Sequence, residues 1–328
     1  MSQWTSAKKI YAMCQSLSRL RGGSPLLYFL DAAYCGYRHG ASPENYFVLR
    51  FFAMKDAERR KYLTSGRSKS ADRELNRQAY VEDRQILGSK ALFNRVFSGL
   101  VNREYVYAPE SEFAAFDGFL SRHDECILKP SRGLQGKGIE KLRTGQVTDR
   151  AALFQRCAED RLLLEEPIAQ HPALALVNAS SLNSVRINAA RDTDGQIRLI
   201  GACLKCGLEG AVSDNFHAGG IAYPLDLETG RITGPGRNNR DLNEYIHHPG
   251  SLVFMPGFQV PYWPSVVDYV RRGMDIVSSV GYVGWDVAVT PEGPELIEGN
   301  YSWPGGNIIQ FDKIGKYPLI LECLGKEI

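Results

Sequence analysis

The most informative stretch of the chain is Gly284-Trp285-Asp286-Val287-Ala288-Val289-Thr290-Pro291-Glu292-Gly293-Pro294-Glu295-Leu296-Ile297-Glu298-Gly299-Asn300. Two short apolar segments flank a Pro-Glu-Gly-Pro sequence, a pattern typical of a β-hairpin with a three-residue turn. If Pro291, Glu292 and Gly293 form the turn, Thr290 opposes Pro294 and Asp286 opposes Glu298. The sequence therefore predicts two antiparallel strands that bring a pair of acids face to face.

The two facing acids of this hairpin suggest a cation site. Side chains alternate between the faces of a strand, which gives one face Asp286, Ala288, Leu296, Glu298 and Asn300, and the other Val287, Val289 and Ile297. Carboxylates about 5 Å apart repel each other, and both stay ionised only with a cation between them. Asp286, Glu298 and Asn300 offer hard oxygen, which suits Mg²⁺ or Mn²⁺ better than zinc. The alternative is a hairpin whose acids merely face solvent.

Composition sets the broad class of the protein. The chain has 328 residues, 44% of them apolar and 23% charged, as in an ordinary globular protein. A formal net charge of +2 argues against a dedicated nucleic-acid-binding protein. No apolar run reaches the roughly 18 residues of a membrane span, and the first residues lack the apolar core of a signal peptide. We therefore expect a cytoplasmic protein without a nucleic-acid or membrane partner.

The seven cysteines are odd in number and scattered, which indicates free thiols rather than a disulfide framework. Cys203 and Cys206 have redox or zinc spacing, but no second pair accompanies them. Their surroundings read as a strand, where a spacing of three places the two sulfurs on opposite faces. A structural role is therefore favoured over a redox or zinc site.

Residues 1–85 are predicted to be mostly helical. Residues 7–20 and 26–37 show helical patterns, and Ser42 with Pro43 has the signature of a helix start. Residues 55–77 carry eight Lys and Arg against four Asp and Glu. Such a run is either a solvated helix face or a surface that attracts an anionic substrate or partner.

A glycine-rich segment lies between two predicted strands, residues 126–129 and 139–142. Residues 131–138 read Ser-Arg-Gly-Leu-Gln-Gly-Lys-Gly, and backbone N–H groups in such a loop can close over phosphate oxygens. The segment is not a P-loop, because GK[ST] is missing and a strand rather than a helix follows. A glycine-rich hairpin without function is the alternative.

Three further strands are predicted at residues 161–168, 184–190 and 197–206. The first ends in Glu165 and Glu166 and leaves its sheet at Pro167. Arg186 and Lys205 lie on the other two. Basic groups on apolar strands are costly unless they meet an anion, so both are either ion-paired or catalytic.

The order of these motifs resembles the ATP-grasp superfamily, in particular its sugar-transfer-associated branch. The resemblance covers roughly residues 85–310 and rests on five motifs: Ile-Leu-Lys-Pro-Ser at 127–131, Gly-Lys-Gly-Ile at 136–139, Asp-Asn-Phe-His-Ala-Gly-Gly at 214–220, Gly-Trp-Asp-Val-Ala at 284–288 and Ile-Glu-Gly-Asn-Tyr-Ser-Trp-Pro-Gly at 297–305.

This resemblance implies an α+β, two-lobed fold that grips ATP between its lobes. The expected parts are a helical N-terminal region (1–85), a small lobe with the glycine-rich hairpin (86–167) and a large lobe with the metal site (168–328). The residues expected to bind the ATP phosphates are Lys90, Lys129, Ser131, Gly133, Gly136, Lys137 and Gly138. Glu165, Glu166 and Ile168 are expected to read the adenine.

The resemblance also implies a catalytic centre on the large lobe. Arg186 and Lys205 are expected to stabilise the transferring phosphoryl group, and Asp286, Glu298 and Asn300 to hold two Mg²⁺ ions, with Mn²⁺ as an alternative. The expected substrate contacts are Asn215, His217, Gly219 and Gly220. Many relatives bind ribose with an acid that this chain lacks after the linker, which leaves Gln170 or His171 for that contact.

The function implied is ATP-dependent ligation of a carboxylate to an amine or thiol through an acyl phosphate, with ADP and phosphate as products. The name of the branch suggests that the small-molecule substrate is an amino acid or is linked to a sugar, in glycan or secondary metabolism. A homodimer is the candidate assembly. One alternative is a small-molecule kinase on the same scaffold, for which Asp214 is the candidate proton acceptor. A nucleotide-responsive binding module without turnover is the other.

Overall fold

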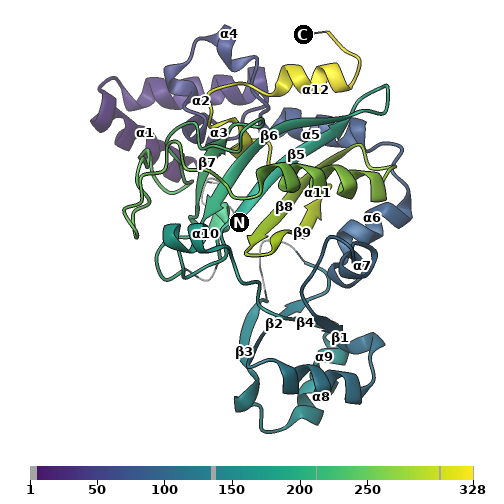
Figure 1. Ribbon diagram of the computed structural model, residues 1–328. Coiled ribbons are helices and arrows are strands. Elements are labelled where there is room, and N and C mark those ends of the chain that lie inside the picture. Colours follow the sequence, from purple (N-terminus) through teal and green to yellow (C-terminus); the bar gives the residue numbers. More distant parts are fainter. Residues whose placement is uncertain (1–5, 134–137, 212, 303, 328) are drawn as a thin grey trace.

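The computed structural model describes residues 6–133, 138–211, 213–302 and 304–327, and contains two antiparallel sheets in separate lobes (Figure 1). The small lobe has a four-stranded sheet of order β1-β4-β2-β3, and the large lobe a five-stranded sheet of order β7-β6-β5-β8-β9. The strands are β1 (Tyr105–Tyr107), β2 (Glu125–Pro130), β3 (Glu140–Arg143), β4 (Leu162–Glu165), β5 (Ser184–Arg191), β6 (Ile197–Cys206), β7 (Ile221–Leu225), β8 (Tyr282–Thr290) and β9 (Gly293–Asn300). The α+β class is confirmed.

Helices dominate the first part of the chain, as predicted. The helices are α1 (Ala7–Arg21), α2 (Pro25–His39), α3 (Pro43–Val48), α4 (Asp56–Arg59), α5 (Ser65–Leu75), α6 (Val81–Gly88), α7 (Lys90–Val96), α8 (Phe113–Arg122), α9 (Arg150–Glu159), α10 (Pro172–Val177), α11 (Trp263–Ile276) and α12 (Tyr317–Cys323). Ser42 caps α3 in a capping box and Pro43 occupies its first turn, which confirms the predicted helix start. No described helix is long and apolar enough to cross a membrane.

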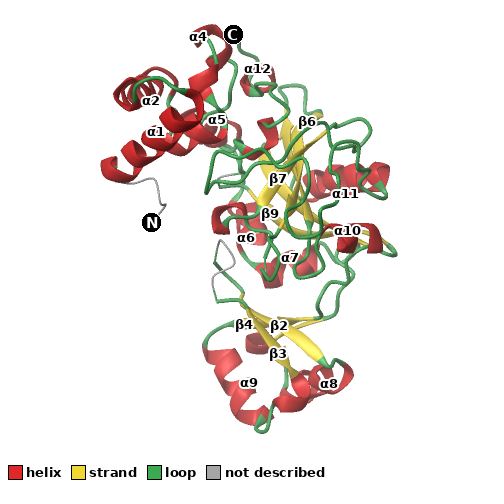
Figure 2. Ribbon diagram, turned by 90° about the vertical axis from the view of Figure 1, so that its left-hand side faces the viewer, coloured by secondary structure: helices red, strands yellow, loops and turns green. Residues whose placement is uncertain are grey.

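The N-terminal helices pack onto the large lobe (Figure 2). Phe51 and Leu63 share one buried cluster with Cys203 on β6 and with Ile309 and Phe311, which follow β9. Segments far apart in the sequence therefore close one core, and the N-terminal helices bury part of one face of the five-stranded sheet.

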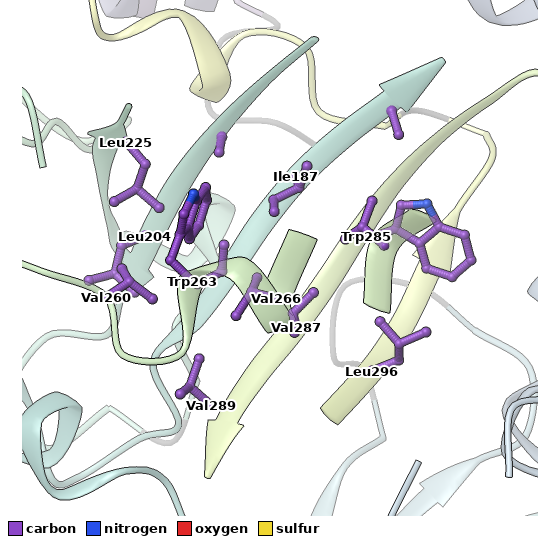
Figure 3. Close-up of a cluster of buried hydrophobic side chains, with 14 of the residues drawn as sticks. Ile187, Leu204, Leu225, Val260, Trp263, Val266, Trp285, Val287, Val289 and Leu296 are labelled. Carbon is purple, nitrogen blue, oxygen red and sulfur yellow. The ribbon is translucent and has the colours of Figure 1, made fainter. Parts of the chain in front are cut away.

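Helix α11 covers the opposite face of that sheet (Figure 3). Trp263 and Val266 of α11 pack against Ile187, Leu204 and Val287 from three different strands. These side chains are almost fully buried, so this face is an apolar layer and leaves polar chemistry to the other. The four-stranded sheet has its own, smaller core beneath α8 and α9.

The central hairpin has the predicted strands, but the predicted turn is wrong. Thr290 pairs with Gly293, so two residues rather than three form the turn, and Val287 pairs with Leu296. Leu296 consequently joins Val287 in the apolar cluster under α11 (Figure 3). A three-residue turn would have placed this leucine on the polar face, and burial of its side chain favours the observed register.

A β-bulge restores the predicted pairing of the two acids. The register shifts by one residue between Asp286 and Val287, and Asp286 still faces Glu298. Between the turn and the bulge, Ala288 faces Glu295 rather than Leu296. Glu295 is thereby buried, with 3% of its surface exposed, which requires a cationic partner.

The cysteines are free thiols, as the sequence predicts. Cys203 belongs to the cluster under the N-terminal helices and Cys206 to the cluster under α11. The two sulfurs therefore lie on opposite faces of β6, and the structural interpretation of their spacing is confirmed. Burial raises the pKa of both thiols, that of Cys203 to about 12.

Candidate active site

The polar face of the five-stranded sheet carries two cations around one buried carboxylate, Asp286. Arg186 on β5 pairs directly with Asp286 on β8, and its Nε and Nη2 atoms donate to the two carboxylate oxygens at 2.8 and 2.7 Å. Lys205 on β6 reaches the same carboxylate, with 2.9 Å between Nζ and Oδ1. We call Arg186, Lys205, Asp286 and the neighbouring Asp214 the Asp286 cluster.

Charges in this cluster stabilise one another against the cost of burial. Burial alone would raise the pKa of Asp286, but Arg186 and Lys205 outweigh it and lower that pKa to about 2. Burial acts to lower the pKa of Lys205, yet Asp214 and Asp286 keep it above its usual value. The site therefore holds fixed positive charges at neutral pH, the arrangement that stabilises a developing negative charge.

Asp214 is the second carboxylate of the cluster. Its Oδ2 lies 3.7 Å from Nζ of Lys205 and accepts hydrogen bonds from the hydroxyl group and, at 3.0 Å, the backbone N–H of Ser184. Burial raises the pKa of Asp214, although Lys205 and Ser184 act against it. A carboxyl group with a raised pKa in such a site is suited to accept or release a proton.

Glu298 and Asn300 lie beside the cluster on β9 and are half-buried. Glu298 faces Asp286 across the hairpin, and its Oε1 accepts a hydrogen bond of 3.0 Å from Nδ2 of Asn300. Two carboxylates and an amide oxygen fit Mg²⁺ in donor chemistry. The described residues contain no group of three or more His, Cys, Asp and Glu side chains that could hold a metal ion. An ion here would thus need further ligands from a nucleotide or from water.

A close backbone approach ties the loop after β9 to this cluster. Nη1 of Arg186 donates to the carbonyl oxygen of Pro304 at 3.0 Å. A Cβ atom on Gly284 would lie 2.4 Å from that oxygen and 2.8 Å from Nη1. Glycine is therefore required at position 284 for the loop to reach the arginine.

A second group of buried charges lies at the junction of the two lobes. Glu165, at the end of β4, forms ion pairs with Lys129 of β2 and with Arg103, whose Nε lies 3.1 Å from its Oε2. Nδ2 of Asn94 donates to its Oε1 at 2.6 Å. Arg103 also pairs with Glu295 on β9 of the large lobe. We call Asn94, Arg103, Lys129, Glu165 and Glu295 the Glu165 cluster.

The charges of the Glu165 cluster are strongly coupled. Burial opposes ionisation of Glu165, but Arg103 and Lys129 lower its pKa to about 2. Burial lowers the pKa of Lys129, with Glu165 acting against it. Lys129 and Glu165 were predicted as nucleotide residues, and here each holds the other's side chain. The sequence analysis did not predict a role for Arg103 or Glu295. The signal in the sequence was Glu295, an acid in the middle of a buried strand.

Lys90 and the glycine-rich segment are close together, as expected for one binding surface. Nζ of Lys90 donates to the carbonyl oxygen of Gly133 at 3.0 Å. The backbone N–H of Lys90 donates to the carbonyl oxygen of Ser131 at 2.8 Å. Gly138 has a φ of 73° and packs against Pro130, a backbone conformation that favours glycine. Gly136 and Lys137, also predicted here, lie outside the described residues.

The predicted adenine linker follows β4. Glu166 and Ile168 are half-buried, and the backbone of Glu166 donates to Glu104 at 2.9 Å. Gln170 is occupied structurally, because its amide donates to Asn178 and Ser181 and accepts from Asn183. Among the described residues, His171 makes one side-chain hydrogen bond: its Nδ1 accepts from the backbone N–H of Ala173 and caps α10. Of the two ribose candidates, His171 is therefore the one with a polar atom to spare in the described structure.

The predicted substrate loop directly follows Asp214 of the Asp286 cluster. The backbone N–H of Gly220 donates to the carbonyl oxygen of Asn215 at 3.1 Å and closes a turn. Gly219 has a φ of 102°, and the side chain of Arg240 packs against it. His217 is half-exposed, with Nδ1 3.9 Å from Oε1 of Glu44. His217 thus presents its side chain away from the loop, toward Glu44 of α3.

Comparison with solved structures finds ATP-grasp ligases among the neighbours. A Staphylococcus aureus N5-carboxyaminoimidazole synthetase with ADP is 10% identical (TM-score 0.49), over 76% of this chain and 55% of that one. A Vibrio cholerae D-alanyl-alanine synthetase A is 14% identical, with a TM-score of 0.43, over 74% of this chain and 62% of that one. The ATP-grasp ligase PsnB with its minimal precursor is also 14% identical, with a TM-score of 0.45, over 76% of this chain and 64% of that one. The chain spans less than two thirds of each of these three structures.

Comparison with curated protein sequences gives no match. A family model described as "Sugar-transfer associated ATP-grasp" matches residues 80–315, which is most of the chain and includes both charge clusters. The order of motifs, the two lobes and this match agree, and the chain belongs to the sugar-transfer-associated ATP-grasp family.

Proposed function

We propose that this protein is an ATP-dependent ligase that joins a small-molecule carboxylate to an amine or a thiol. The substrate carboxylate attacks the γ-phosphorus of ATP, which releases ADP and forms an acyl phosphate. The amine nitrogen then attacks the acyl carbon, loses a proton and expels inorganic phosphate. The association of the family with sugar transfer favours a substrate linked to a sugar, in glycan synthesis.

The observation that carries this proposal is the Asp286 cluster beside two half-buried oxygen donors. Arg186 and Lys205 are held rigidly by Asp286, so their charges are preorganised for the transferred phosphoryl group. Phosphoryl transfer depends on such positioning and electrostatics rather than on covalent help from the protein.

Asp286, Glu298 and Asn300 fit a Mg²⁺ site, with two ions expected and Mn²⁺ as an alternative. When bound, the metal offsets the charge of the nucleotide phosphates. On the small lobe, Lys90 and the backbone of residues 131–133 face the phosphates, and the linker at Glu166 to Ile168 faces the adenine. The lobes would then correspond to residues 86–167 and 168–328.

The test is the fate of the phosphate and of the carboxylate oxygen. With a carboxylate labelled with heavy oxygen, an acyl-phosphate mechanism transfers one labelled oxygen to inorganic phosphate and yields ADP. Hydroxylamine in place of the amine should give a hydroxamate. Release of AMP and pyrophosphate, or phosphate without label, would rule the proposal out.

A kinase that phosphorylates a hydroxyl group is the second candidate, and Asp214 is the observation that favours it. This carboxyl has a raised pKa and lies beside Lys205, so it can accept the hydroxyl proton. The same experiment separates the two functions. A kinase retains the phosphate on its product and releases ADP without inorganic phosphate.

A further inference from the structure

The exposed face of helix α2 is almost entirely apolar. At about 100° per residue, seven exposed side chains fall within an arc of about 140° on this helix, and we call them the α2 stripe: Leu26, Leu27, Leu30, Ala33, Tyr34, Tyr37 and Arg38. Leu27 is 66% exposed and Tyr37 is 91% exposed. The opposite side of α2 packs into the N-terminal core through Ala32 and Cys35. Single exposed apolar residues are ordinary, but a continuous apolar stripe indicates an interaction site.

Elements on both sides of the α2 stripe continue this surface. Tyr11 of α1, itself 39% exposed, packs edge-on against Phe29 of α2, just outside one edge of the arc, with 6.1 Å between the ring centroids. Toward the other edge, the hydroxyl group of Tyr34 donates to Asp56 of α4 at 3.2 Å. Helices α1 and α2 lie on the large lobe, on the side away from the small lobe (Figure 1, Figure 2). The stripe is therefore the middle of a broader face formed by three helices.

The charge of the chain is concentrated in the same region. Residues 1–77 carry 14 Lys and Arg against six Asp and Glu, a net charge of +8, whereas residues 78–328 carry 25 against 31, a net charge of −6. Arg38 is an exposed member of the stripe, and the exposed Lys8 lies one helical turn from Tyr11 on α1. A strongly basic region in an otherwise acidic chain is typical of a surface that meets an anionic partner.

Two acids adjoin the α2 stripe, and both are paired within the protein. Asp31 on α2 forms an ion pair of 2.7 Å with Arg59. Asp56 on α4 lies 2.6 Å from Nε2 of His39 and 3.1 Å from Nε of Arg60. Because these carboxylates have partners in the N-terminal region, they do not offset the exposed cations of the stripe and of α1.

We propose that the α2 stripe docks the protein on an anionic membrane surface. Leucine side chains enter the boundary between headgroups and acyl chains, tyrosine rings suit an interface with one apolar and one polar side, and Lys and Arg attract acidic headgroups. A symmetric dimer through this face would set the same basic region against itself, and a nucleic acid would leave the leucines without an apolar partner. We expected no membrane partner from the sequence because no segment is long enough to span a bilayer, but a helix that lies on the surface needs no such span.

Vesicle flotation with the full chain, without nucleotide, tests the docking. We expect binding at low salt to phosphatidylcholine vesicles that contain one third phosphatidylglycerol. Binding to phosphatidylcholine alone should be about tenfold weaker or more, because the attraction to acidic headgroups is lost. Binding to the acidic vesicles should weaken as salt is added, since salt screens exposed charges. No binding to the acidic vesicles, or equal binding to the two kinds, would overturn the proposal.

Variants locate the docking face. Leu27→Ser removes an exposed side chain, so it should leave the melting temperature unchanged and weaken vesicle binding about tenfold. Leu176→Ser is the matched control, because Leu176 on α10 is 72% exposed and lies outside the stripe. Arg38→Gln should weaken binding about threefold to tenfold, whereas Arg143→Gln, at an exposed arginine on β3 of the small lobe, should not. Equal effects of the Leu27 and Leu176 variants would contradict the assignment.

The oligomeric state separates docking on a membrane from contact between two copies of the chain. We expect the parent and Leu27→Ser to have the same mass in sedimentation equilibrium without vesicles. A dimer of the parent that Leu27→Ser dissociates would assign the stripe to a protein interface and overturn the proposal. Flotation requires neither nucleotide nor turnover, so failure of the proposed ligase function would leave this test intact.

Discussion

The Glu165 cluster and the Asp286 cluster both consist of acids buried among lysine and arginine, but they differ in how much of their surroundings is closed. Every charged member of the Glu165 cluster is at most 7% exposed, and its carboxylates are held by Arg103, Lys129 and Asn94. The Asp286 cluster is buried too, yet it borders the half-buried Glu298 and Asn300. The charges of the Glu165 cluster are therefore paired entirely by protein groups, whereas the Asp286 cluster has an accessible side.

This difference separates structural from chemical roles for the same residue types. A buried charge that is fully paired contributes specificity of arrangement, and removing one partner strands the other. Arg103 pairs with acids from both sheets, so it fixes how the small lobe meets the large one. The accessible side of the Asp286 cluster is where a charged substrate can be recognised.

The largest expected effect comes from breaking the closed cluster. Arg103→Met should lower the free energy of unfolding by about 3–5 kcal/mol, because Glu165 and Glu295 would be left buried with less compensation. Urea denaturation at pH 7 measures this change. Arg95→Met is the matched control, since Arg95 is exposed and pairs with the exposed Glu110; it should cost less than about 1 kcal/mol. Equal losses in the two variants would contradict the structural role of Arg103.

Acid should destabilise the protein through both clusters. Glu165 and Asp286 have pKa values of about 2 in the folded protein, against ordinary values of 4.5 and 3.8. The unfolded chain therefore binds protons first, and the free energy of unfolding should fall as the pH drops from about 5 to about 2. The raised pKa of Asp72, about 6, acts in the opposite sense and at higher pH.

The slope of this acid limb identifies the groups responsible. Each group contributes up to about 1.4 kcal/mol per pH unit. Urea denaturation at several pH values in high salt, which screens the exposed pairs, should show a shallower limb for Glu165→Gln than for the parent protein. An unchanged slope would show that Glu165 has the same pKa in the folded and unfolded states and would contradict its lowered pKa in the folded protein.

Much of the fold and part of the site could be predicted from local sequence. Arg186, Lys205 and Asp286 lie on strands that the apolar pattern predicts, and strand alternation places their side chains correctly. The hairpin turn could not be predicted, because the choice between two and three residues depends on the burial of Leu296 under α11. The pairing of Arg103 with Glu295 spans 192 residues, and no local spacing encodes it.

A smaller effect is expected where the open cluster is altered. Glu298→Gln should lower kcat by about a hundredfold, since it removes a charge from the candidate metal site. The free energy of unfolding should stay within about 0.5 kcal/mol, because the one hydrogen bond that the Glu298 side chain makes within the described residues comes from Asn300, and glutamine can also accept it. Glu292→Gln in the exposed turn is the control and should change neither quantity. Full activity of Glu298→Gln would remove Glu298 from the site.

The smallest effect on stability, and the sharpest contrast with the closed cluster, is expected at Lys90. Its ammonium group is half-buried and donates only to the carbonyl oxygen of Gly133 in the described structure. Lys90→Met should therefore change the free energy of unfolding by no more than about 0.5 kcal/mol, unlike a change at Lys129, whose loss would strand Glu165.

Nucleotide binding should respond to Lys90 even though stability does not. ATP with Mg²⁺ stabilises the folded state by mass action, and losing one charge-assisted contact to phosphate should weaken its affinity about tenfold or more. Lys90→Met should then lose most of the rise in melting temperature at a nucleotide concentration near the parent's Kd. Lys141→Met, an exposed lysine of the same lobe that pairs with Glu125, should keep it. If both variants keep the full rise, Lys90 does not contact the nucleotide, and the accessible surface beside Gly133 is not where the phosphates bind.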